Sequence, residues 1–154
     1  MIKIMFVCHG NICRSPMAEF IFKDVVNKKG LEGEYYVTSS ATSDEEIYRG
    51  VGNPVYPPAK RVLNKHGISC EGKYAVRLKK EDYNNYDFFI AMDDYNIRNI
   101  NRIFGHDNDS KVRKLLDYCG GGDVADPWYS GDFETTFNDI SRGVDAMLKL
   151  GKNL

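Results

Sequence analysis

The sequence lacks several features that would direct it to a membrane or a polyanion. No apolar run approaches the roughly 20 residues that a membrane-spanning helix requires. Its net charge is only −1, because 21 lysines and arginines stand against 22 aspartates and glutamates. Such a balance creates no overall field that would attract nucleic acid or an anionic lipid surface. We therefore expect no nucleic-acid and no membrane partner, and we expect recognition at a local site.

Cysteine is also scarce, and its spacing argues against two classes of protein. The chain has four cysteines, Cys8, Cys13, Cys70 and Cys119. They form neither a Cys-x-x-Cys pair nor the dense framework of a disulfide-stabilised secreted domain. A zinc site built from Cys8, His9 and Cys13 would lack a fourth ligand at a usual spacing. We therefore expect a reduced, cytoplasmic protein with no metal and no cofactor.

Internal repeats and low-complexity tracts are absent too, and 154 residues with 42% hydrophobic content suit one domain over residues 1–154. Apolar patterning predicts strands alternating with helices from residue 2 onward. Such alternation favours an α/β fold, a doubly wound parallel sheet with helices on both faces. The expected strands cover residues 2–7, 34–41, 88–92 and 112–116, and the main helices cover 16–28, 58–66, 94–103 and 133–148.

The segment from Val7 to Pro16 joins the first strand to the first helix through a polar loop. Gly10 and Asn11 tolerate the positive φ of a tight turn, and Ser15 is placed to cap a helix whose first residue is Pro16. Backbone N–H groups of such a loop, together with the positive end of the helix dipole, favour a tetrahedral anion. The predicted phosphate-binding residues are His9, Gly10, Asn11, Ile12, Cys13, Arg14 and Ser15.

Three side chains of this segment add chemistry to the predicted anion site. Cys8 ends the strand and feels the same positive field, which favours its thiolate form. Arg14 offers a planar pair of donors that can hold two oxygens of a phosphoryl group. Ser15 can donate a hydrogen bond to the sulfur. We therefore predict a nucleophilic cysteine at the base of an oxyanion site.

A cysteine followed six positions later by Arg and then Ser is the signature of the protein tyrosine phosphatases, and Val7 to Glu19 closely resembles the low-molecular-weight branch. The resemblance implies four central strands and the phosphate-binding loop after the first of them. It also implies hydrolysis of phosphotyrosine and aryl phosphate monoesters through a phosphocysteine, without a metal. The expected partners are a phosphotyrosine-containing protein, for example a tyrosine kinase, and inorganic phosphate or another oxyanion in the loop.

A second segment supplies the proton donor that cleavage of a phosphate monoester requires. Arg14 is permanently charged and cannot serve, so we predict Asp126 as the general acid. Its surroundings, Asp-Pro-Trp-Tyr after three glycines, resemble the family's Asp-Pro-aromatic-Tyr loop. Trp128 and Tyr129 are predicted to flank the substrate ring. Tyr48, in an irregular stretch from Thr42 to Pro58, is a candidate for another part of the pocket wall, and the alternative is an exposed loop tyrosine, which is the commoner outcome.

The family resemblance also implies residues that support the loop. A serine at the end of the second strand should brace it through Asn11, and Ser40 is our candidate, with Ser39 as a close competitor. His66 is expected to pair with an acid, for which Asp93 is the candidate. Asp93 and Asp94 themselves favour capping of the helix that follows them.

Cys13 carries a further hypothesis. It lies across the turn from Cys8 and could form a reversible disulfide that protects the nucleophile from irreversible oxidation. The alternative is that Cys13 is a buried spacer. The resemblance adds weight to the redox role without excluding the spacer.

Three other functions remain open at the level of sequence. Thioredoxin-coupled arsenate reductases share the loop but need two further cysteines, and Cys70 and Cys119 are not arranged like that pair. Protein arginine phosphatases resemble the chain but carry threonine where Ile12 stands. A passive phosphate-binding module would need neither Cys8 nor Asp126.

Overall fold

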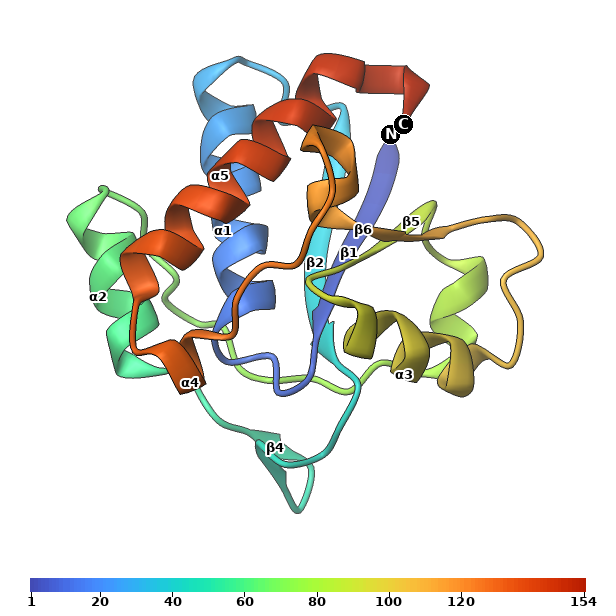
Figure 1. Cartoon of the computed structure of the whole chain (residues 1–154), viewed down its shortest axis with the longest axis horizontal. Helices are drawn as coiled ribbons and strands as arrows, with labels where there is room; N and C mark the ends of the chain where they lie inside the picture. The colour runs from blue at the N-terminus through green and yellow to red at the C-terminus, as the bar shows by residue number, and fades with distance from the viewer.

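The centre of the protein is a parallel sheet of four strands in the order β2-β1-β5-β6. A computed structural model describes the whole chain, Met1–Leu154. The strands are β1 (Ile2–Cys8), β2 (Tyr35–Ala41), β5 (Phe88–Ala91) and β6 (Val112–Lys114). Every neighbouring pair is parallel, so the carboxyl ends of all four strands meet at one edge of the sheet (Figure 1). Ligand sites of open α/β sheets form at this edge.

β1 lies between β2 and β5, and its alternating side chains enter two different cores. Ile4 and Phe6 belong to the larger cluster, whereas Met5 and Val7 belong to the smaller one on the opposite face. A strand covered on both faces reads as a continuous apolar run, which explains why residues 2–7 are so uniformly hydrophobic. The predicted α/β fold is confirmed.

Helices cover both faces of the sheet (Figure 1). The larger core is closed by α1 (Arg14–Lys28), α2 (Pro57–Lys65) and α5 (Phe133–Leu150). The smaller core is closed by α3 (Asp94–Phe104) and by a 3-10 helix over Lys80–Asn84. No helix is both long enough and apolar enough to cross a membrane.

The remaining elements are short, and the C-terminal one lies beside the amino end of β1 (Figure 1). A hairpin of β3 (Ile47–Tyr48) and β4 (Val51–Gly52) projects below the carboxyl edge of the sheet, and α4 (Pro127–Ser130) precedes α5 (Figure 1). Further 3-10 turns cover Leu115–Cys119 and Gly151–Asn153.

Two expected boundaries are wrong. The fourth strand ends at Lys114, because Leu115 and Leu116 turn into the larger core within a 3-10 helix instead of continuing the strand. Helix α1 begins at Arg14, so Ser15 lies inside its first turn and is not the cap. The Ser15 hydroxyl is used elsewhere, as described next.

Candidate active site

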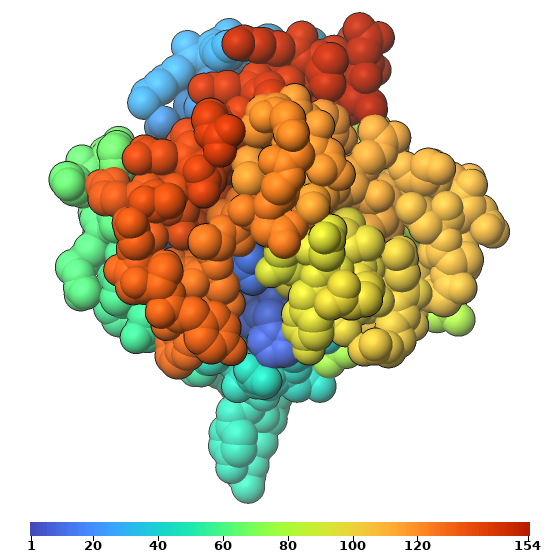
Figure 2. All heavy atoms as spheres, viewed as in Figure 1, coloured from blue at the N-terminus to red at the C-terminus, as the bar shows by residue number.

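The loop between β1 and α1 forms the floor of a pocket at the carboxyl edge of the sheet. Figure 2 shows this N-terminal segment, in blue, at the bottom of a hollow between the orange residues of the α4 region and the yellow residues of α3. The pocket is lined by Cys8, His9, Gly10, Asn11, Ile12, Cys13, Arg14, Glu45, Glu46, Asp126, Trp128 and Tyr129. All predicted phosphate-binding residues except Ser15 therefore face it directly.

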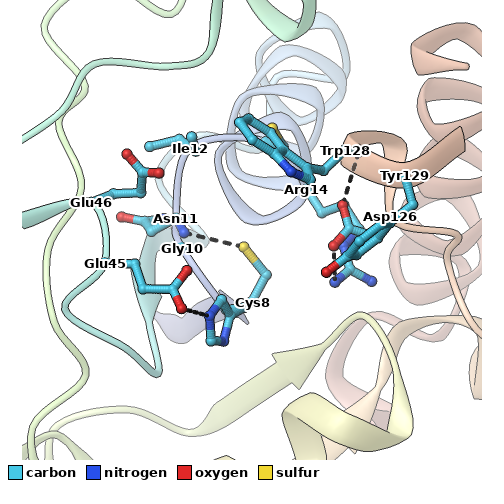
Figure 3. Close-up of a pocket in the computed structure, with 12 residues that line it drawn as sticks. Cys8, Gly10, Asn11, Ile12, Arg14, Glu45, Glu46, Asp126, Trp128 and Tyr129 are labelled. Carbon is cyan, nitrogen blue, oxygen red and sulfur yellow. Dashed lines mark hydrogen bonds and ion pairs between the residues drawn. The ribbon is translucent and has the colours of Figure 1, made fainter. Parts of the chain in front are cut away.

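Cys8 presents its sulfur to this pocket from the end of β1. The Asn11 backbone N–H donates to Cys8 Sγ over 3.3 Å (Figure 3), and Ser15 Oγ lies 3.0 Å from the same sulfur. The hydroxyl can direct its proton to the sulfur, because Asn11 Nδ2 already donates to Ser15 Oγ over 2.7 Å. The sulfur therefore has two potential hydrogen-bond donors at the floor of the pocket.

Asn11 holds the turn of the loop. Its φ is +59°, in the left-handed region that asparagine tolerates better than most residues. Its side chain donates to Ser39 Oγ over 2.9 Å and accepts from the Val76 N–H over 3.0 Å, besides the contact with Ser15. The bracing serine is therefore Ser39. The choice of Ser40 was wrong, since its hydroxyl instead lies 3.0 Å from the sulfur of Met5.

A buried ion pair behind the loop was missed by the sequence reading. Ser39 Oγ donates to Glu19 Oε1 over 2.6 Å, and Lys73 Nζ lies 3.6 Å from that oxygen while donating to the Ser39 carbonyl over 3.0 Å. Burial lowers the pKa of Lys73, although Glu19 works against the shift. One indication was present in the sequence, because Glu19 is a charged residue among the apolar residues of α1. No local pattern indicated that Lys73 would be its partner.

Arg14 is fixed at the side of the pocket by residues distant in sequence. Its Nη1 donates to Asp93 Oδ2 over 2.7 Å and to the Val124 carbonyl over 2.8 Å. Burial opposes the guanidinium charge, but Cys8 and Asp93 outweigh it and raise the pKa of Arg14. Asp93 also caps α3 by accepting from the Asn96 N–H over 2.7 Å, as expected of this residue.

His66 pairs with an acid, as expected, but the candidate Asp93 was wrong, because Arg14 occupies Asp93. His66 Nε2 lies 3.2 Å from both carboxylate oxygens of Glu134, and its ring stacks on Phe137 at a centroid distance of 3.9 Å. This contact joins α2 to α5 and lies outside the pocket.

Asp126 reaches the pocket from the segment before α4. Its Oδ2 lies 3.6 Å from Arg14 Nη2, and its Oδ1 accepts from the Trp128 N–H over 3.0 Å (Figure 3). Trp128 and Tyr129 are 56% and 87% exposed and lie on the same side of the pocket. We call these two residues the aromatic wall. A cysteine sulfur, a guanidinium group and a carboxyl group thus line one cavity.

Comparison with known proteins gives the family. A model of the family "Low molecular weight phosphotyrosine protein phosphatase" matches residues 3–154. The chain belongs to this family. The low molecular weight protein-tyrosine-phosphatase YfkJ of Bacillus subtilis is 40% identical over 151 residues, which cover 96% of this chain and 94% of that protein. The predicted family, the predicted fold class and the predicted activity as a cysteine-dependent protein tyrosine phosphatase are confirmed.

Solved structures agree. The crystal structure of YfkJ has a TM-score of 0.92 at 39% identity and covers 99% of this chain and 96% of its own. A low molecular weight protein tyrosine phosphatase from Streptococcus pyogenes has a TM-score of 0.84 at 36% identity, covering 97% and 92%. The Drosophila arginine phosphatase DARP has a TM-score of 0.85 at 26% identity, covering 96% of each chain.

The side of this phosphatase's pocket opposite Trp128 and Tyr129 is charged. Glu45 and Glu46, from the segment between β2 and β3, line it (Figure 3), and we call them the acidic wall. Tyr48, expected in the wall, does not line the pocket. It lies on β3 of the projecting hairpin and is 73% exposed, so the role in the pocket wall was wrong and the alternative, an exposed tyrosine, is confirmed. Because Tyr48 lies on β3, it is exposed outside the pocket, whereas the two glutamates that precede the strand line the pocket.

Cys13 is buried at the start of α1 and is a free thiol. Burial, together with the negative charges of Cys8 and Asp126, raises the pKa of Cys13 to about 12. At neutral pH it is therefore a poor nucleophile, and in the phosphatase reaction it stays a thiol. Its disulfide with Cys8 remains a prediction.

Proposed function

We propose that this phosphatase, one catalytic domain over residues 1–154, uses Cys8 as nucleophile and Asp126 as general acid. Cys8 Sγ attacks phosphorus in line with the departing phenolic oxygen. A sulfur–phosphorus bond forms, the phosphorus–oxygen bond breaks, and the proton of Asp126 passes to the leaving oxygen. Arg14 and the loop N–H groups hold the equatorial oxygens of the transferring phosphoryl group.

In the second step Asp126, now a carboxylate, takes a proton from water. The water oxygen attacks phosphorus, and Cys8 leaves as a thiolate that Ser15 and the Asn11 N–H stabilise. Phosphate then departs from the loop. The loop donors and Arg14 supply the charge stabilisation in both steps, so this scheme assigns no role to a metal.

The observation that carries the proposal is the meeting of Cys8, Arg14 and Asp126 around one pocket. A passive phosphate-binding site would need the loop alone. Here the sulfur lies at the floor of the pocket and the carboxyl group of Asp126 lies at the rim. An aryl phosphate bound with its phosphoryl group at the floor would have its phenolic oxygen toward the rim. Ile12 adds an apolar surface to the pocket, which favours a phenolic substrate.

We further propose a phosphotyrosine-containing protein, such as a tyrosine kinase, as the substrate, and inorganic phosphate as a ligand of the loop. Four free cysteines, with a thiolate nucleophile among them, support a reducing compartment such as the cytoplasm. The relation to DARP makes phosphoarginine a control substrate, for which we expect much slower turnover than for phosphotyrosine.

The first experiment is hydrolysis of an aryl phosphate in the presence of a chelator and a reductant, by the wild type and by Cys8→Ser. We expect metal-independent turnover by the wild type and none by the variant. Folding of the variant is checked by circular dichroism. Residual turnover by a folded Cys8→Ser protein would remove Cys8 from the role of nucleophile.

A further inference from the structure

The pocket mouth has two walls of different chemistry. The aromatic wall, Trp128 and Tyr129, offers faces against which a phenolic ring can pack. The acidic wall, Glu45 and Glu46, stands opposite it across Cys8 (Figure 3). A phosphate ester enters between the two. The aromatic wall explains affinity for a ring, but nothing in the two-step chemistry uses the glutamates.

Both glutamates are held in place by neutral or weakly basic partners. Glu45 Oε1 lies 3.0 Å from His9 Nε2, which belongs to the loop itself. Glu46 Oε2 accepts from Asn53 Nδ2 over 2.7 Å, and its Cγ packs so near Gly10 that a Cβ there would lie 3.3 Å from it. These contacts orient the carboxylates at the pocket and leave oxygens of both residues available to a ligand.

The local charges give the acidic wall a negative potential. Lysine does not occur in the pocket lining, and the one arginine, Arg14, is bound to Asp93 at the side of the pocket. Arg77, from the stretch after α2, lies against the β2–β3 segment, but its Nη1 is 3.1 Å from Asp44 Oδ2 and is thus already paired. An acidic peptide entering here would be repelled, whereas a peptide with a cation beside its phosphotyrosine would be attracted.

We infer that Glu45 and Glu46 form a subsite for a lysine or arginine side chain directly adjacent to the phosphotyrosine of the substrate. The inference rests on the proposed function, because it needs the phosphoryl group bound at Cys8 and the ring against the aromatic wall. The adjacent side chain then extends across the mouth toward the glutamates. Arginine suits the subsite best, since its planar guanidinium can bind a carboxylate through two parallel hydrogen bonds.

The test uses three phosphotyrosine peptides that differ only in the residues on both sides of the phosphotyrosine: arginine, glutamine or glutamate. For the wild type at low ionic strength we expect kcat/KM to fall in that order, by about fivefold at each step, the scale of one partly exposed ion pair. The single variants Glu45→Gln and Glu46→Gln should reduce the differences in kcat/KM between the peptides. The double variant should bring kcat/KM for the arginine and glutamine peptides within about twofold of each other. Added salt should also reduce the differences in kcat/KM between the peptides for the wild type.

The matched control is Glu32→Gln, which removes one exposed carboxylate before β2, at the opposite end of the sheet. This variant should keep the full wild-type differences in kcat/KM between the three peptides. Equal rates for the three peptides in the wild type, or a spread that survives the double variant, would overturn the subsite and leave the catalytic roles intact. If no peptide were hydrolysed in a Cys8-dependent manner, the proposed function itself would fail.

Discussion

The floor of the pocket and its aromatic rim are held by very different means. Every polar side chain of the floor that touches Cys8 is itself bonded to a further buried group, from Ser15 to Asn11 and from Asn11 to Ser39. The rim has few such contacts. Asp126 accepts one hydrogen bond from the backbone of its own turn, and Trp128 packs at the surface against Tyr56 at a centroid distance of 5.0 Å.

This difference separates two demands of the chemistry. The floor must match the charge of the phosphoryl group at all times, and a fully bonded buried network provides that rigidity. The rim must admit a substrate and release a phenol, and weakly held segments open at little cost. Substitutions in the floor should therefore change stability, whereas substitutions in the rim should change kinetics alone.

The largest kinetic effect at the rim is expected from Asp126→Asn. Loss of the proposed proton donor should lower kcat for an ordinary phenyl phosphate by roughly two to four orders of magnitude. The melting temperature should stay near that of the wild type. The carboxyl group is partly exposed, makes one local hydrogen bond, and lies 3.6 Å from an Arg14 side chain that Asp93 and the Val124 carbonyl also hold. Steady-state kinetics and calorimetry on the same preparation check both statements. Near-normal turnover would show that another group supplies the proton.

Breaking the ion pair behind the floor should have the largest effect on stability. Lys73→Met removes the buried cation beside Glu19, where the two side chains are only 11% and 6% exposed. It leaves that carboxylate paired with the half-exposed Lys23 alone, whose Nζ lies 2.6 Å from Glu19 Oε2. Because Lys23 and the Ser39 hydroxyl still bind Glu19, we expect a loss of about 1–3 kcal/mol in the free energy of unfolding, measured with urea.

The double variant Glu19→Leu/Lys73→Met gives the control for this pair. It removes both charges and should recover much of the loss, because a buried pair replaced by apolar groups costs less than one broken on one side. Additive losses would show that Glu19 and Lys73 do not act as a pair, and that the floor is held by the serine and asparagine contacts alone.

The smallest effect should follow from Trp128→Ala. Loss of one aromatic contact to the substrate ring should raise KM for an aryl phosphate by about fivefold, which corresponds to about 1 kcal/mol. The free energy of unfolding should change little, because the indole is more than half exposed. The variant Tyr48→Ala is the matched control, since Tyr48 is also more than half exposed but lies outside the pocket. An equal rise in KM for both variants would argue against a specific aromatic wall.

The parts of the site that could be predicted from sequence are those built by neighbouring residues. The strand, loop and helix from Val7 to Glu19 are continuous in the chain, so the residue types in this segment predict its local backbone geometry. Asp126 was predicted because a second motif surrounds it. Its role in the reaction stays a proposal.

The contacts that sequence could not give depend on strand faces and long-range partners. Ser39 and Ser40 are the same residue type, and the alternation of β2 alone decides which one faces Asn11. The placement of β3 likewise turned Tyr48 away and brought Glu45 to the pocket. His66 met Glu134 instead of Asp93 because α2 packs on α5, and no local pattern encodes that packing.

The anchoring of Arg14 has a consequence for the order of folding. The nucleophile and the arginine are among the first residues of the chain, yet the Arg14 partners Asp93 and Val124 lie 79 and 110 residues further on. Contacts between residues so far apart close late, because the chain must first lose the entropy of the intervening loop. During synthesis the reactive cysteine therefore leaves the ribosome long before its guanidinium partner is fixed. The thiol gains its full reactivity only when most of the molecule has folded around it.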